Sequence, residues 1–235
     1  MATMSEIPEA FQKGMWPFMG HEFFTERGVL YPRTESTILV ETVVDLVKTG
    51  AIPSAPRVLD PCGGSGALGI AVALFVPTAH VWTTDIMEQA SALSRRNVAK
   101  HHLESRVEVH TGDLFKAVAG LGLEGTIDAI LCSPPFISTG RLSKDRAYLL
   151  DHEPREAFDA GPYGVSMHMR LIKESLPLLK PGGYLVCEYG EGQAKQVEAL
   201  VTRAKAYDQI RVLSDGEGVQ RALCARKMVA ATSAV

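Results

Sequence analysis

The sequence is poor in the features that mark several large classes of protein. Its four cysteines lie far apart without a C-x-x-C pair, and its seven histidines form no cluster with metal-ligand spacing. Neither a disulfide scaffold nor a metal site is therefore predicted, and reduced, buried thiols in a cytoplasmic protein are expected instead. No apolar run approaches the roughly 18 residues that a membrane span needs, and the N-terminal segment lacks the pattern of a signal peptide. We expect neither membrane insertion nor secretion.

An excess of positive charge is also missing. The formal net charge is −3 and the calculated pI is about 6.2. Proteins dedicated to nucleic acids usually carry a basic excess, because neutralising phosphates dominates their affinity. The only dense basic runs are Arg95-Arg96 and residues 100–102, which we place on one solvated helix face. We therefore expect no nucleic-acid partner; the oligomeric state is left open by the sequence.

Strand-like and helix-like patterns alternate from residue 57 onward. Seven strands are predicted at Arg57–Asp60, His80–Asp85, Arg106–His110, Ile127–Cys132, Gly183–Glu188, Gln209–Leu213 and Ala222–Lys227. Helices are predicted at Ser36–Thr49, Ala67–Phe75, Glu88–His102, Leu114–Ala119, Val165–Leu179 and Gly192–Ala206. This alternation predicts an α/β fold with a doubly wound, mostly parallel, Rossmann-like sheet of seven strands. The last two strands have no helix between them, so they are expected to form an antiparallel hairpin.

Two segments interrupt this alternation. Residues 11–35 are rich in aromatic side chains, and residues 133–163 form a long connection rich in proline and glycine. Long ordered loops inside compact domains usually carry function. We expect both segments to cover the same sheet edge, with residues 1–35 as an extension over the substrate. Residues 36–228 would form the main domain, and residues 229–235 a flexible tail.

A glycine-rich turn follows the first predicted strand. Its spacing, Gly64-x-Gly66-x-x-Gly69, is that of nucleotide-binding turns, in which glycines let the backbone approach a ligand. The same spacing also fits a plain strand-to-helix turn. Asp85 ends the second predicted strand, where a carboxylate can bind both ribose hydroxyls or, alternatively, cap the next helix. Together they indicate a nucleotide cofactor.

Two further carboxylates bear on which nucleotide is bound. Asp60 directly precedes the glycine turn, where it would repel a pyrophosphate but attract the amino group of a sulfonium cofactor. This argues against an NAD(P) oxidoreductase and favours S-adenosylmethionine. Asp113 follows the third predicted strand, where it can reach an adenine amino group; it fits equally well as the cap of the helix that starts at Leu114.

The most specific short motif is Ser133-Pro134-Pro135-Phe136, directly after an apolar strand. Two consecutive prolines fix the backbone and remove two N–H donors, which leaves carbonyl acceptors at the strand end. Carbonyl acceptors suit a substrate N–H group, and the ring of Phe136 can stack on a planar or cationic group. A rigid turn with a core phenylalanine is the plainer interpretation of these four residues alone. Because the motif follows the glycine turn and Asp85 in this order, a catalytic role is favoured over a plain turn.

In this order the motifs resemble those of class I S-adenosylmethionine-dependent amino-methyltransferases. The closer resemblance is to the release-factor glutamine methyltransferases of the PrmC/HemK type. Residues 28–36 resemble the V-L-I-P-R-P-E-T segment of that family, residues 152–164 resemble its E-P-R-x-A-L-x-G-G-x-D-G loop, and residues 178–190 resemble its fifth-strand region. The resemblance covers roughly residues 20–225. It implies a class I methyltransferase domain with S-adenosylmethionine as cofactor.

The resemblance also implies residue roles. With the carboxylates above, the predicted cofactor-binding set is Asp60, Gly63, Gly64, Gly66, Asp85, Ile86, Asp113, Leu114 and Ser133. The predicted catalytic set is Ser133, Pro134, Pro135 and Phe136, whose backbone carbonyls and Ser133 hydroxyl would accept hydrogen bonds from the acceptor N–H and aim its lone pair. The predicted substrate-binding set is Tyr31, Arg33, Glu35, Phe136, Glu153 and Arg155.

Three departures from the family bear on the acceptor. Ser133 stands where the family usually has Asn, and Phe136 where it has Tyr. Only about 20 residues precede the matching segment, so the helical domain that grips the release factor is expected to be absent. We therefore expect N-methylation of a small molecule or free amino acid, with arginine as the first candidate. Glutamine methylation in a protein is the alternative, ahead of nucleic-acid methylation. A catalytically silent module is disfavoured, because the chain keeps Asp85 and the two prolines.

Overall fold

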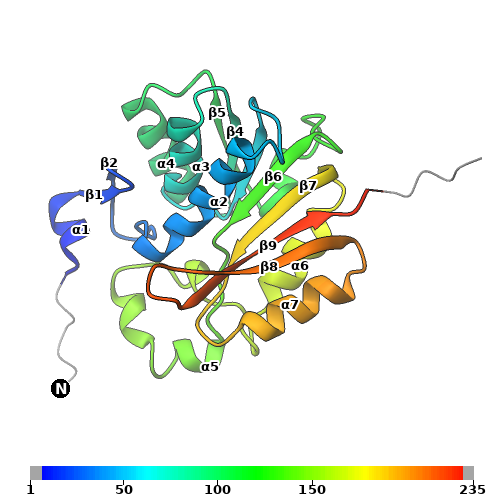
Figure 1. Cartoon of the computed structure of the whole chain (residues 1–235). Helices are drawn as coiled ribbons and strands as arrows, with labels where there is room; N and C mark the ends of the chain where they lie inside the picture. The colour runs from blue at the N-terminus through cyan, green and yellow to red at the C-terminus, as the bar shows by residue number, and fades with distance from the viewer. Residues whose placement is uncertain (1–6, 230–235) are drawn as a thin grey trace, which may run out of the picture.

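One seven-stranded sheet runs through the centre of the computed structural model, which describes residues 7–229. Its strands are β3 (Arg57–Pro61), β4 (His80–Asp85), β5 (Val107–Thr111), β6 (Ile127–Cys132), β7 (Leu179–Glu188), β8 (Tyr207–Ser214) and β9 (Gln220–Lys227). They lie in the order β5-β4-β3-β6-β7-β9-β8 (Figure 1). All neighbouring pairs are parallel except the two that involve β9. The predicted fold class is confirmed, including the antiparallel hairpin.

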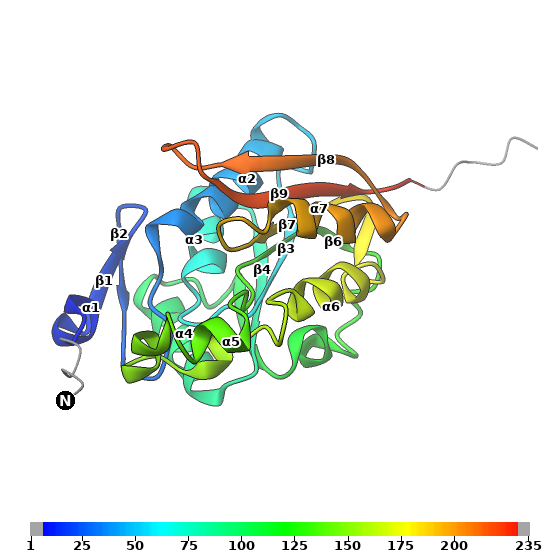
Figure 2. The ribbon, with the colours of Figure 1, turned by 90° about the horizontal axis from the view of Figure 1, so that it is seen from below.

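Helices cover both faces of this sheet (Figure 2). One face carries α2 (Thr37–Lys48), α3 (Ala67–Phe75) and α4 (Glu88–Lys100); the other carries the 3₁₀ helix η2 (Leu114–Val118), α6 (Ser166–Glu174) and α7 (Ala194–Arg203). Successive strand residues alternate between the two cores: Ala129 packs with the first set of helices and Ile130 with the second. Strands buried on both faces in this way read as continuous apolar runs.

Most predicted elements differ from the observed ones by a few residues at their ends, and the largest difference is at α6. This helix ends at Glu174, and β7 already begins at Leu179, where the backbone pairs with Ile127. Proline disfavours helical backbone in the residue before it, so Pro177 stops the helix before the predicted end at Leu179. The segment Lys180–Gly183 belongs to the strand, and the pairing register shifts within it.

The aromatic N-terminal segment has more regular structure than predicted. It forms α1 (Glu9–Lys13) and an antiparallel hairpin of β1 (Met15–Phe18) and β2 (His21–Phe24), followed by η1 (Thr34–Ser36). Met19 and Gly20 both have positive φ, the conformation of a tight hairpin turn that matches strand twist. Phe18 and Phe23 are buried in the core beside α2 and α3. The aromatic residues therefore anchor this segment to the domain.

The long connection between β6 and α6 contains α5 (Thr139–Leu142), η3 (Ala147–Asp151) and η4 (Arg155–Ala157). It packs against the N-terminal segment: the Gly28 N–H donates to the His152 carbonyl at 2.9 Å, and the Tyr31 N–H donates to Glu153 at 3.3 Å. The two irregular segments thus contact each other. No helix among residues 7–229 is long and apolar enough to cross a membrane. Of the predicted tail, residues 229–235, only Val229 is among the described residues.

Candidate active site

The site lies where the strand order reverses, between β3 and β6. The chain leaves β3 toward one side of the sheet and β6 toward the other, so their carboxyl ends leave a crevice. Two cavities occupy it, with volumes of about 250 Å³ and 820 Å³. Five residues line both cavities: Leu30, Cys62, Gly64, Ser133 and Ala157. The glycine turn after β3 and the motif after β6 therefore form a common wall.

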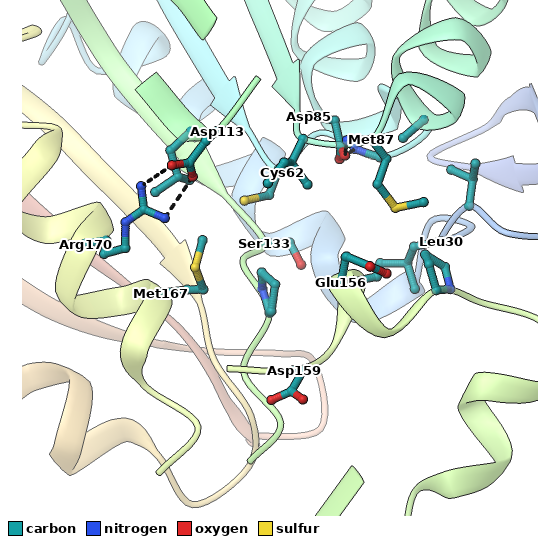
Figure 3. A pocket seen from close by; sticks show the side chains of 18 residues that line it. Leu30, Cys62, Asp85, Met87, Asp113, Ser133, Glu156, Asp159, Met167 and Arg170 are labelled. Atoms are coloured by element: carbon teal, nitrogen blue, oxygen red, sulfur yellow. Dashed lines mark hydrogen bonds and ion pairs between the residues drawn. The ribbon is translucent and has the colours of Figure 1, made fainter. Parts of the chain in front are cut away.

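The smaller cavity holds most of the residues predicted to bind the cofactor. Asp85, Ile86, Asp113, Leu114 and Ser133 all line it (Figure 3). The Asp85 carboxylate accepts hydrogen bonds from the Gly64 and Met87 N–H groups, each at 2.9 Å. Partial burial raises its pKa above the ordinary value. The Ile86 N–H also interacts with this carboxylate. Because a carboxylate offers about four lone-pair sites, Asp85 can accept a further hydrogen bond from a ligand.

Asp113 is engaged by a partner that sequence reasoning missed. Arg170 of α6 donates to its two oxygens at 2.8 Å and 2.9 Å, and also pairs with Glu174. Figure 3 shows this pair at one end of the cavity, with Asp85 and Met87 on the far side of Ser133. Arg170 holds the pKa of Asp113 below its usual range. The Asp113 side chain does not cap η2, and its predicted contact with adenine stays a prediction.

The glycine turn places its members at different depths. Gly64 lines both cavities, and a side chain there would meet only the Leu30 carbonyl, at 3.7 Å. Gly66 lines neither cavity; its φ is +80° and a Cβ atom would lie 2.3 Å from the Ser94 hydroxyl of α4. Gly63 lines the larger cavity. The space beside Gly64 is thus open to a ligand, whereas Gly66 serves helix packing.

Asp60 lies behind this turn. It is fully buried, lines neither cavity, and accepts hydrogen bonds from the Gly69 N–H at 2.9 Å and from Thr83 at 3.3 Å. Burial raises its pKa to about 7. The contact predicted between Asp60 and a cofactor amino group is absent from this geometry, because the carboxylate turns back to hold the start of α3. Its direct role therefore stays a prediction.

The larger cavity receives the predicted catalytic motif. Ser133, Pro134 and Phe136 line it, whereas Pro135 lines the smaller one. Gln193, which carried no signal in the sequence, donates to the Phe136 carbonyl at 2.9 Å and accepts from the Gly190 N–H at 2.7 Å. That carbonyl is therefore occupied, and Gln193 ties the motif to the loop after β7.

The predicted substrate-binding residues separate into two groups. Tyr31, Arg33 and Glu35 line the larger cavity. Arg33 stacks on the Tyr31 ring at 3.5 Å and forms an ion pair with Glu153. Glu153 is buried outside both cavities, and burial raises its pKa to about 7 in spite of this ion pair. Arg155 also lies outside both cavities and pairs with Asp159 at 3.1 Å. Glu153 and Arg155 therefore contact other side chains of the two loops rather than either cavity.

Comparison with known proteins agrees with this arrangement. The sequence profile of the methyltransferase small domain matches residues 34–152. A release factor glutamine methyltransferase from Moorella thermoacetica is 33% identical over 93% of this chain and 74% of its own length. The chain belongs to this family. A second member, from Bradyrhizobium diazoefficiens, is 32% identical over 94% of this chain and 73% of its own length.

Solved structures show the same fold. The N-terminal domain of human METTL16 in complex with SAH has a TM-score of 0.60 at 18% identity, covering 84% of this chain and 72% of that one. The ribosomal protein L11 methylase from Lactobacillus delbrueckii subsp. bulgaricus has a TM-score of 0.57 at 16% identity, covering 86% of this chain and 83% of that one. Membership of the family shown by the sequence comparisons makes the chain an S-adenosylmethionine-dependent N-methyltransferase.

The smaller cavity fits that cofactor. Asp85 retains acceptor capacity, the space beside Gly64 is open, and Ile86 offers an exposed apolar surface to a ring. Among the described residues no group of His, Cys, Asp and Glu side chains is arranged to hold a metal ion. The cofactor, when bound, supplies an activated methyl carbon on a sulfonium. The residues that hold it therefore have to orient it and exclude water.

Proposed function

We propose that this methyltransferase acts on the side-chain amide nitrogen of a glutamine in a protein of the release-factor kind. The support comes from the relatives: those from Moorella thermoacetica, Bradyrhizobium diazoefficiens and Clostridium acetobutylicum are all named release factor glutamine methyltransferases. The chain covers 74%, 73% and 63% of their lengths. The preference for a free amino acid such as arginine finds no support among these relatives.

The observation that carries the proposal is the wall between the two cavities. Ser133 lines both of them, as do Gly64 and Cys62, so a donor in the smaller cavity and an acceptor in the larger one would meet there. The larger cavity, at about 820 Å³, exceeds a glutamine side chain several times over. It therefore has room for the peptide residues on either side of the acceptor.

Within this proposal the motif after β6 orients the acceptor. The Pro134 carbonyl and the Ser133 hydroxyl would accept hydrogen bonds from the amide N–H groups and turn the nitrogen lone pair toward the shared wall. Phe136, half-buried in the larger cavity, would stack on the planar amide. Tyr31, on whose ring Arg33 stacks, lines the same cavity.

The test is a methyl-transfer assay followed by mass spectrometry. The enzyme is incubated with methyl-labelled cofactor and, in separate reactions, a purified bacterial release factor, the same factor with its acceptor glutamine changed to alanine, free glutamine and free arginine. We expect label on the glutamine of the intact factor only. Label on free arginine, or on the altered factor at an equal rate, would overturn the proposal.

A further inference from the structure

A buried carboxylate lies beside the catalytic motif, and none of the roles above uses it. Glu188 ends β7, is 3% exposed, and lines the larger cavity. It accepts a hydrogen bond from the Ser36 hydroxyl at 2.7 Å, and the Ser133 side chain, which lines the same cavity, interacts with it and lowers its pKa. Two serine side chains, one of them in the motif itself, thus converge on one carboxylate.

The surroundings of Glu188 decide its charge. Burial raises its pKa, as does the neighbouring carboxylate of Glu35, whereas the two serines and Arg221 of β9 lower it. On β7 itself Cys187 is a buried thiol whose own pKa is raised to about 12, so it stays neutral. From α6, His168 bonds to the Glu188 carbonyl at 2.8 Å, and burial lowers its pKa. The pKa of Glu188 is therefore raised above that of an ordinary glutamate, and its charged neighbours are the Glu35 carboxylate and the Arg221 guanidinium.

We propose that Ser133 and Glu188 form a relay that removes the proton from the acceptor nitrogen. Ser133 faces the acceptor, and Glu188 acts through it as a positioning and proton-accepting residue. A serine hydroxyl can accept one hydrogen bond while it donates another, whereas the asparagine usual in the family cannot pass a proton in this way. The relay thus gives a function to Ser133, which stands where the family usually has asparagine.

A nitrogen–carbon bond forms while the carbon–sulfur bond of the sulfonium breaks, leaving its electron pair on sulfur. The nitrogen gives up one proton to the Ser133 oxygen, and the electron pair of that N–H bond stays on nitrogen. Ser133 passes its own hydroxyl proton to the Glu188 carboxylate, which ends neutral. An amide nitrogen is a weak nucleophile, so removal of this proton favours methyl transfer.

This inference rests on the proposed function in taking an amide N–H as the acceptor. The experiment measures kcat over a pH series with labelled cofactor and release factor, for wild type, Ser133→Ala, Glu188→Gln and the double variant. Ser133→Thr keeps the hydroxyl, and Ser36→Ala removes one donor to Glu188 without touching the motif. Glu124→Gln, an exposed carboxylate outside both cavities, is the matched control.

We expect each single variant of the relay to lower kcat by about 10²-fold, the lower range for general base catalysis, with KM little changed. The double variant should fall no further, because both residues serve one step. In wild type kcat should rise with pH as Glu188 ionises, and Glu188→Gln should lose this rise. Ser36→Ala should move the rise to higher pH, since its hydroxyl lowers the pKa of Glu188. Ser133→Thr should restore activity.

Calorimetry with S-adenosylhomocysteine and thermal unfolding show whether each variant is folded. If Glu188→Gln does not fold, the pH dependence of kcat in Ser36→Ala tests the relay instead: a rise that is not shifted to higher pH would contradict it. A rise with pH that persists in Glu188→Gln, or singles whose losses multiply in the double variant, would overturn the relay. Wild-type enzyme that labels a different acceptor would overturn the proposed function alone, and the same pH series on that acceptor would then decide the relay.

Discussion

Removing the carboxylate of Asp85 should weaken cofactor binding more than any other single change in the smaller cavity. The carboxylate lines that cavity and keeps acceptor capacity beyond its bonds to the Gly64 and Met87 N–H groups. One hydrogen bond to a charged acceptor contributes about 1.5–3 kcal/mol, which corresponds to a loss of roughly ten- to 150-fold in affinity. Asp85→Ala should therefore weaken binding of S-adenosylhomocysteine by at least about tenfold.

Part of that loss would arise from the turn rather than from the ligand. Asp85→Ala leaves two backbone N–H groups without their acceptor, which costs about 1 kcal/mol each where they are partly buried. Asp85→Asn keeps one oxygen as an acceptor, so it should bind with intermediate affinity and unfold closer to wild type. Glu88→Gln, an exposed carboxylate three residues away that pairs with Arg95, should bind like wild type.

The assay is isothermal titration calorimetry at fixed pH and salt, with thermal unfolding of each variant alongside. Wild type should bind S-adenosylhomocysteine at micromolar concentration and bind NAD and NADP negligibly. If Asp85→Ala and Asp85→Asn both bind as tightly as wild type, the carboxylate does not contact the cofactor. Tight binding of NAD would contradict the assignment of the cavity.

Three further outcomes follow from the structure. Phe136→Ala should depress turnover strongly and leave cofactor affinity nearly intact, because Phe136 lines only the larger cavity; calorimetry and kinetics on one preparation check this, and loss of folding would instead make the ring part of the core. Glu153 has its pKa raised from 4.5 to about 7, so the neutral form is favoured in the folded state: its contribution to stability is present below pH 4.5 and is lost as the pH rises to about 7. At about 1.4 kcal/mol per pKa unit, the free energy of unfolding of wild type should fall by up to about 3 kcal/mol more than that of Glu153→Gln between pH 5 and 8, as denaturant unfolding would measure. If the free energy of unfolding depends on pH equally in both proteins, the raised pKa of Glu153 is contradicted. Cys62 is half-buried and lines both cavities, whereas the other three cysteines are buried; a thiol reagent should modify Cys62 first, and saturating S-adenosylhomocysteine should slow this modification, as peptide mass spectrometry would show.

The sequence by itself determined the sheet, the glycine turn and the order of the motifs. These are local: the six residues Ile127–Cys132, apolar apart from Asp128 and closely followed by two prolines, indicate a buried strand that ends there. Asp85 and Ser133 follow β4 and β6, which lie on either side of β3, and they meet because the carboxyl ends of parallel strands share one edge of the sheet. The hairpin β1–β2 escaped prediction because its strands are short and its turn has Met19 in the left-handed conformation, for which methionine has no preference.

Only the tertiary structure decided which polar groups face each other. Arg170 pairs with Asp113, 57 positions away in the chain, and Glu188 accepts a hydrogen bond from Ser36, 152 positions away. No sequence pattern relates such pairs, since they depend on how helices pack on the sheet. Asp60 and Arg155 were predicted to contact ligands, and those roles stay predictions; both side chains already have partners in the structure. Burial behind the glycine turn directs Asp60 to the Gly69 N–H and the Thr83 hydroxyl, and the bend of the long loop directs Arg155 to Asp159.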